Sequence, residues 1–193
     1  MLRYVFSSLL VLLTLALPLA ADAQAVALDL DPAQSTVDFT LGAFLHTVHG
    51  SFKLKGGTLR LDPEAGKAQG EIDIDLASGA TGNGARDDVM RNSVLEVQHY
   101  PDAVFAADAV AGRLNADGPS TLDIHGRLAI HGATHDFTIH VLVVTTGTLL
   151  TATTRFTIPY AQWGMKNPST FLLRVNDHVE VNVRASAHLH PAS

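Results

Sequence analysis

Apolar and polar residues alternate along most of the chain from Ala25 onward, which is the pattern of strands with one buried and one exposed face. The alternation is clearest in STVDFTL, TVHGSFKLK, GGTLRLD and EIDIDL, at residues 35–41, 47–55, 56–62 and 71–76. Further strands are predicted at residues 104–110, 122–130, 137–144, 149–158 and 179–189. The pattern therefore predicts an all-β protein.

Turn residues separate these strands at intervals of roughly 8 to 15 residues, which suits antiparallel hairpins and leaves no room for helical crossovers. About eight to ten strands in one domain favour a closed barrel or a sandwich, because both hide their strand edges. The long alternation in residues 179–189 favours the barrel, although a sandwich would produce the same pattern. The turn signals are Gly56-Gly57, Asp62-Pro63 with Gly66, residues 116–119, His131-Gly132 and Gly147.

Residues 86–97 interrupt the alternation and carry a helical pattern. Asp87 and Arg91 are four residues apart in the order that favours an ion pair, and Asn83 is a suitable N-cap. We therefore expect a short helix that closes one end of the barrel. Its inward apolar stripe would consist of Met90, Val94 and Val97.

Residues 1–23 are predicted to be a secretory signal peptide. An apolar run at 5–17 ends at Pro18, and the triplet Ala-Asp-Ala that closes at Ala23 matches a cleavage site. The alternative is a retained membrane anchor, since the apolar run is nearly long enough to span a bilayer. Cleavage would leave no stable membrane anchor.

Residues 24–193 have the length of a single domain with a real core. The chain has no cysteine, so disulfides and metal–thiolate sites are excluded. Its formal net charge is −6, and the absence of a Lys/Arg cluster argues against nucleic acid and anionic membrane surfaces as partners. These features are typical of a periplasmic or secreted protein of the bacterial envelope.

Catalytic signatures are sparse. The sequence has no nucleophile elbow, no His-Glu-x-x-His motif, no phosphate loop and no dinucleotide fingerprint. His131 and His135 flank a predicted turn and could converge on a metal with a third ligand, whereas His46 and His49 would face opposite sides of a strand. A metal-assisted hydrolase therefore remains an alternative, although no metal site is predicted.

Two groups of charged residues have competing interpretations. Glu71, Asp73 and Asp75 alternate along one strand and resemble a calcium site, but three carboxylates in a row are more typical of a solvated face. Arg86 and Asp87 could bind an anion or transfer protons. A structural role at the helix N-terminus is the stronger interpretation.

The inward faces of the predicted strands supply an apolar lining. In an eight-stranded barrel such a lining either packs into a solid core or encloses one elongated ligand, and the pattern alone leaves both open. The residues expected to line the cavity are Phe39, Val48, Phe52, Leu54, Ile72, Ile74, Met90, Val94, Phe105, Phe137, Phe156 and Val181.

Four ordered blocks of the sequence resemble the YceI-like family, also called the polyisoprenoid-binding or lipid-binding domain. The central block, TGNGARDDVMRNSVLEVQHYPDAVF, carries the Thr-Gly-Asn, Arg-Asp and Tyr-Pro elements and the following Phe105. The others are VHGSF, LAIHGATHDFTIHV, and FTIPYAQWGM with DHVEVNV, at residues 48–52, 128–141, 156–165 and 177–183.

The resemblance implies a lipocalin-like antiparallel up-and-down β-barrel of about eight strands, with a short helix near residues 86–97. It implies an exported protein that carries or stores a long isoprenoid, such as a polyprenyl quinone, or another fatty amphiphile, without catalysis, cofactor or metal. The resemblance leaves open whether the protein forms a homodimer. The competing functional classes are the metal-assisted hydrolase and a ligand-free stress or interaction module.

Overall fold

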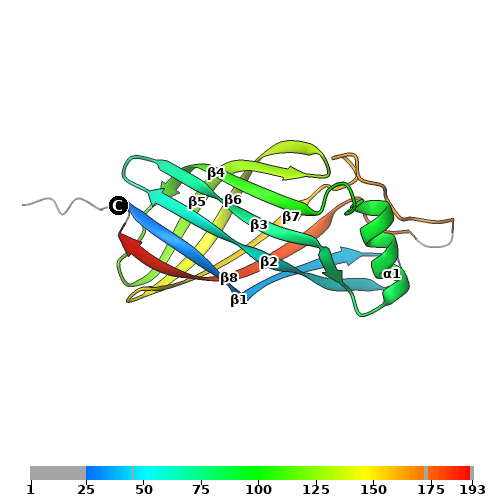
Figure 1. The fold of residues 1–193 in the computed structure, drawn as a ribbon, viewed down its shortest axis with the longest axis horizontal. Helices are drawn as coiled ribbons and strands as arrows, with labels where there is room; N and C mark the ends of the chain where they lie inside the picture. The colour runs from blue at the N-terminus through cyan, green and yellow to red at the C-terminus, as the bar shows by residue number, and fades with distance from the viewer. Residues whose placement is uncertain (1–24, 45, 172–173, 192–193) are drawn as a thin grey trace, which may run out of the picture.

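The computed structural model describes residues 25–44, 46–171 and 174–191, and these residues form a closed antiparallel barrel of eight strands. Each strand pairs with its neighbour in sequence, and β1 closes the barrel against β8 (Figure 1). The strands are β1 (Val26–Gly42), β2 (Thr47–Asp62), β3 (Lys67–Ala80), β4 (Asp102–Gly112), β5 (Gly118–Ile130), β6 (Ala133–Thr146), β7 (Leu149–Ile158) and β8 (Val179–Pro191).

This architecture confirms the predicted all-β up-and-down barrel and excludes the sandwich. The signal peptide predicted at residues 1–23 lies outside the described residues. In the part of the chain that the structure describes, no helix is long and apolar enough to cross a membrane.

The turn predicted at Gly56-Gly57 was wrong, because β2 runs through both glycines. Its register with β3 shifts between Leu54 and Gly56, so the glycines accommodate a bulge rather than a reversal. A Cβ atom on Gly57 would lie 2.7 Å from the carbonyl oxygen of Glu71, which shows how closely the two backbones approach. The two predicted stretches at 47–55 and 56–62 are therefore one strand.

A second irregularity bends β1 near its middle. The register of β1 shifts between Asp29 and Val37 in its pairing with β2, and between Asp31 and Thr36 in its pairing with β8. The Asp31 carboxylate accepts hydrogen bonds from the backbone N–H of Ala33 and from the Gln34 side chain, both at 2.8 Å. These bonds lower the pKa of Asp31, that from Ala33 most. The bulge also gives Pro32 a position where no ladder hydrogen bond is required.

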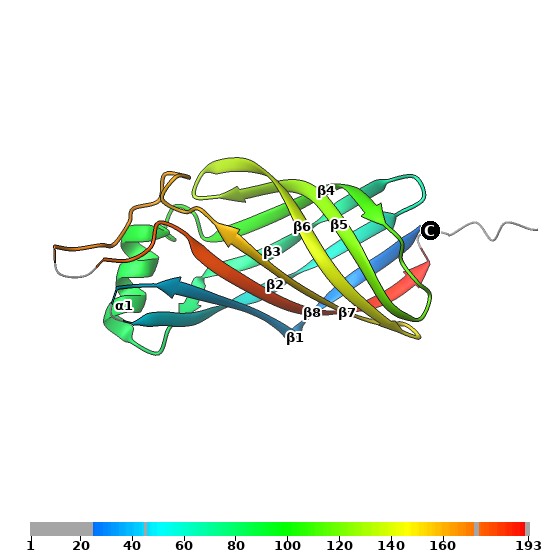
Figure 2. The same ribbon diagram turned by 180° about the vertical axis from the view of Figure 1, so that it is seen from behind.

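The predicted helix is present, but it begins and ends earlier than the predicted range of residues 86–97. It consists of α1 (Gly84–Val89) and a π-helical turn, η1 (Met90–Val94), and it lies at one end of the barrel (Figure 2). Asn83 caps it as predicted, since its side chain accepts a hydrogen bond from the N–H of Arg86 at 3.1 Å. The helical path ends before Glu96, which has a φ of 48°.

The buried apolar residues form two clusters, one towards each end of the barrel. The cluster away from α1 contains Leu61 and Leu122, among the most buried side chains of the protein. The cluster beside α1 contains Leu76, Leu95 and Tyr160. Apolar side chains are therefore buried towards both ends of the barrel.

Glycines on the inner wall lie under phenylalanine rings. Gly50 pairs with Phe39 across β1 and β2, and a Cβ on Gly50 would lie 2.4 Å from the Phe39 ring and 2.7 Å from the carbonyl oxygen of Ala80. A Cβ on Gly79 would lie 2.6 Å from the ring of Phe52. Glycine therefore lets these rings lie flat against the wall rather than project across the interior.

Replacing Gly50 with alanine should destabilise the barrel by about 1–3 kcal/mol, because the Phe39 ring can move but the Ala80 carbonyl cannot. Chemical denaturation measures this effect, when the midpoint and the slope of the unfolding transition are compared between the variant and wild type. Gly84→Ala is the matched control, since nothing lies within 4 Å of its added Cβ. Equal stability of the Gly50 and Gly84 variants would contradict this account of the wall.

Candidate functional site

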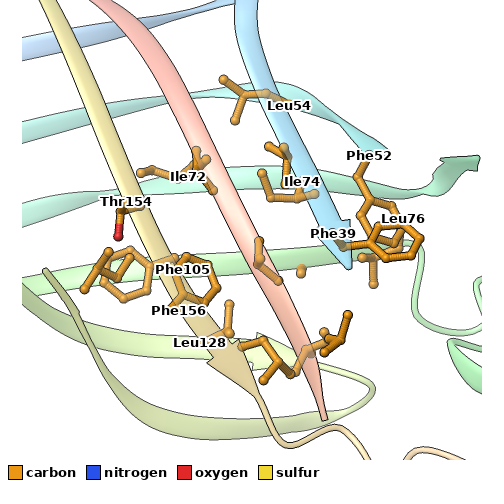
Figure 3. A pocket seen from close by; sticks show the side chains of 18 of the residues that line it. Phe39, Phe52, Leu54, Ile72, Ile74, Leu76, Phe105, Leu128, Thr154 and Phe156 are labelled. Atoms are coloured by element: carbon orange, nitrogen blue, oxygen red, sulfur yellow. The ribbon is translucent and has the colours of Figure 1, made fainter. Parts of the chain in front are cut away.

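The interior of the barrel is hollow. A cavity of about 640 Å³ extends through it and has side chains from all eight strands in its wall. Figure 3 shows part of this wall, including Phe39, Ile72 and Phe156. This volume lies within the range of roughly 300–1,000 Å³ that is typical of small-molecule sites. All twelve residues predicted to line the interior lie in this wall.

Several inward-facing side chains are only partly buried, although they point away from bulk solvent. Phe137, Phe156 and Val181 behave in this way, and all three lie in the cavity wall. Phe137 and Phe156 pack edge to face with centroids 5.2 Å apart, and their remaining surface borders open space. The apolar lining therefore encloses a cavity rather than a solid core.

The polar residues deep in the wall have hydroxyl groups bonded to the backbone. The Ser35 hydroxyl donates to the Asp31 carbonyl, and the Thr154 hydroxyl donates to the His140 carbonyl at 2.8 Å. The wall of the barrel therefore presents an almost entirely hydrocarbon surface to a ligand. The other polar wall residues lie at the α1 end and comprise His46, Thr81, Arg86 and Tyr160.

The cavity opens at the α1 end. Three of its wall residues are solvent-exposed, and all belong to this end: His46 from the β1–β2 loop, and Ala85 and Val89 from α1. At the opposite end the wall is formed by buried leucines, including Leu61 and Leu122. We call the end with His46, Ala85 and Val89 the mouth.

A scan against known families matches residues 28–187 to the YceI-like domain. The chain belongs to the YceI-like family. The match includes all or most of each strand of the barrel and the helix at its mouth. No curated protein sequence matches the chain.

Solved structures share the fold at low sequence identity. BcnA of Burkholderia cenocepacia has a TM-score of 0.68 and 21% identity, over 81% of this chain and 98% of that one. A polyisoprenoid-binding domain from Saccharophagus degradans has a TM-score of 0.65 and 19% identity, over 83% and 97%. The YceI protein of Campylobacter jejuni has a TM-score of 0.59 and 17% identity, over 75% and 86%.

Thr81 organises the helix in the block of sequence that resembles the family most clearly. The Asp87 carboxylate accepts hydrogen bonds from both the backbone N–H and the hydroxyl of Thr81. Arg86 donates to the Thr81 hydroxyl at 2.7 Å and to its carbonyl oxygen at 3.0 Å. Arg86 and Asp87 therefore act through Thr81 to fix α1 across the barrel end, while Arg86 also borders the mouth.

The predicted ion pair between Asp87 and Arg91 was wrong. Asp87 is buried and holds Thr81, so Arg91 pairs instead with the exposed Asp88 at 3.0 Å. Arg91 also donates to the Gly79 carbonyl at 3.1 Å. Of the predicted apolar stripe, Met90 and Val94 lie in the cavity wall, whereas Val97 packs against the core cluster beside α1.

Asp87→Ala should lower the free energy of unfolding by about 2 kcal/mol, because it removes the buried carboxylate that accepts hydrogen bonds from the N–H and the hydroxyl of the partly buried Thr81. Asp88→Ala, one residue along the helix, should change it by less than about 1 kcal/mol, since it removes an exposed ion pair. Urea denaturation of both variants measures the difference. If both substitutions cost the same, Asp87 does not anchor the helix.

The segment between β7 and β8 closes part of the mouth, and sequence reasoning did not identify its lining residues. Met165, Pro168 and Val175 lie in the cavity wall but come from irregular backbone, which has no alternation to reveal them. Tyr160 secures the segment, since its hydroxyl donates to the Asn176 carbonyl at 2.6 Å. Burial, and to a lesser extent the negative charge of Asp177, raises the pKa of Tyr160 to about 12.

This shift predicts an alkaline weakening of the barrel. A phenol whose pKa is raised on folding from 10.0 to about 12 stabilises the folded state fully below pH 10, and the contribution is lost as the pH rises to 12. Tyr160→Phe should be less stable than wild type at pH 8 by about 1 kcal/mol, from the lost hydrogen bond. The difference should shrink between pH 10 and 12. Thermal melts across this range would contradict the account if the difference stayed constant.

The histidines proposed as metal ligands point to separate partners. His131 packs against Tyr100, with ring centroids 4.9 Å apart, and His135 stacks on Trp163 at 3.9 Å. Among the residues that the structure describes, no three His, Asp or Glu side chains are grouped to hold a metal ion. The two histidines therefore do not converge as the hydrolase alternative requires.

The acidic row on β3 meets a lysine. Lys55 forms an ion pair with Asp102 at 2.5 Å. Its hydrogen bond to Asp102 raises the pKa of Lys55, and the charges of Asp75 and Asp73 add to this effect. Lys55 therefore offsets part of the negative charge of Asp73 and Asp75, two of the three residues that resembled a calcium site.

Proposed function

We propose that this chain holds a polyisoprenoid or another long-chain amphiphilic lipid in its barrel cavity and serves as an exported carrier or storage protein. The observation that carries the proposal is the hydrocarbon wall of a cavity of about 640 Å³ that opens at one end. The Saccharophagus degradans domain, which shares the fold, is described as polyisoprenoid-binding.

The chemistry of the wall suits a flexible apolar chain. Each CH₂ group transferred from water into the cavity contributes about 0.8 kcal/mol, so ten such groups contribute about 8 kcal/mol before the costs of ordering the ligand. The apolar tail of the ligand needs no hydrogen bond to the protein for this affinity. Selectivity would therefore depend on the length and width of the cavity.

The polar end of the ligand would remain at the mouth. Arg86 and His46 border the opening and supply hydrogen-bond donors, while Thr81 is already bonded to Arg86 and Asp87. A quinone, hydroxyl or carboxyl group could bind there without entering the apolar interior. This orientation places the ligand tail towards Leu61 and Leu122.

The carrier role and the export of the chain rest on the predicted signal peptide and on the absence of any predicted catalytic motif. A water-filled apolar cavity is unfavourable, so a protein released into an aqueous compartment should retain a ligand through purification. The proposal assigns no catalytic step to the chain. Export would be tested by sequencing the N-terminus of the protein recovered from the cell envelope, with Gln24 expected as the first residue.

Purified protein should release a long-chain lipid on organic extraction, detected by mass spectrometry in near-equimolar amount. Val181→Trp should reduce the amount several-fold, because the added indole occupies space inside the wall. Glu180→Trp is the matched control, since the adjacent residue is exposed on the outside of the same strand and should leave lipid content unchanged.

The proposal would be overturned by two results together. The wild-type protein would yield no lipid, and it would fail to take up an added isoprenoid such as farnesol. Thermal melts of both tryptophan variants establish that a loss of lipid does not reflect a loss of fold.

A further inference from the structure

Two phenylalanine side chains beside the mouth are almost fully exposed. Phe44 is 81% exposed and Phe171 is 93% exposed, and they come from the β1–β2 loop and the β7–β8 segment. Val89, which lies in the cavity wall at the mouth, is 46% exposed. Leaving such rings in water is unfavourable, and exposed apolar groups gathered at one site mark an interaction surface.

Backbone contacts join the β1–β2 loop, which carries Phe44, to the β7–β8 segment, which carries Phe171. The N–H of Phe44 donates to the Arg174 carbonyl at 2.9 Å, and the N–H of Asn176 donates to the Gly42 carbonyl at 2.8 Å. An isolated β-bridge joins Ala43 to Val175 between them. Both views show the coloured part of the β7–β8 segment projecting past α1 at this end of the barrel (Figures 1 and 2).

We propose that this rim, formed by Phe44, Val89 and Phe171, docks on the surface of a lipid bilayer with the mouth facing the membrane. The inference rests on the proposed function. A lipid chain would then pass between the bilayer and the cavity without crossing water.

A bilayer fits this rim better than a protein groove does. Val89 lies in the cavity wall at the mouth, and Phe44 belongs to the same β1–β2 loop as the mouth residue His46, so a surface that covers these side chains also covers the mouth. The exposed Lys166 and Arg174 lie in the same segment as Phe171. Neither forms an ion pair with another described residue, so their charges are available to lipid phosphates.

The net charge of −6 determines how docking must work. It opposes long-range attraction to an anionic membrane, so insertion of the two rings has to supply the binding. Binding to neutral phosphatidylcholine vesicles should therefore be detectable and should depend only weakly on salt. Such a contact is weak and reversible, as a carrier requires.

Flotation with phosphatidylcholine vesicles tests the proposal directly. Residues 24–193, the chain expected after cleavage, are used, because they contain the closed barrel and lack the apolar run at 5–17. Phe44→Ser combined with Phe171→Ser should reduce the bound fraction at least about tenfold. Leu142→Ser combined with Val144→Ser is the matched control, since these residues are 53% and 43% exposed on the barrel side and should leave binding unchanged.

A label reports which end docks. The chain has no cysteine, so Ala85→Cys at the mouth and Ala65→Cys in the β2–β3 turn can each carry one environment-sensitive fluorophore. Vesicles should shift the emission to shorter wavelength at position 85 and leave position 65 unchanged. An equal shift at both positions, or binding by the Phe44/Phe171 variant at the wild-type level, would overturn the docking surface.

A transfer assay separates this inference from the proposed function. The Phe44/Phe171 variant should bind farnesol added from ethanol as wild type does, but should extract a polyprenyl quinone from vesicles at least about tenfold more slowly. Wild-type extraction rates in that variant would overturn docking and leave lipid binding in place. A wild-type protein that docks through the mouth but holds neither lipid would overturn the proposed function alone.

Discussion

The closure of β1 against β8 is the constraint on which the rest of the structure depends. These strands pair over most of their length, so the barrel has no free edge along its circumference. The backbone ladder then supports the wall around the cavity. A hole of about 640 Å³ in a packed core would cost about 15 kcal/mol at about 24 cal/mol per Å³. That is comparable with the whole stability of an ordinary domain.

Several features of the wall are consistent with an open, apolar interior. Glycines beneath the rings of Phe39 and Phe52 let large side chains lie along the wall. Polar groups deep in the wall are bonded to the backbone, whereas Arg86 and Thr81 are placed at the mouth. The buried Asp87 fixes the helix beside the opening. A hydrophobic interior with polar groups confined to one end is the arrangement that an amphiphile needs.

Much of this could be predicted from the sequence, because strand alternation has a period of two and assigns each side chain to one face. All twelve predicted lining residues, from Phe39 in β1 to Val181 in β8, therefore lie at the cavity wall. The errors have physical causes. Gly56-Gly57 has the composition of a turn but forms a bulge within a strand. Asp87 does not pair with Arg91, because its carboxylate accepts hydrogen bonds from Thr81 instead. Met165 and Val175 lie in irregular backbone, where no periodicity applies.

The central claim is that a lipid chain occupies the hollow barrel. A high-resolution crystal structure of the protein, purified without detergent and never unfolded, tests it most directly. The account predicts continuous electron density for an extended chain between Phe39 and Phe156, with its polar end near Arg86. An interior containing only ordered water, or one in which the side chains have collapsed to fill the space, would contradict it.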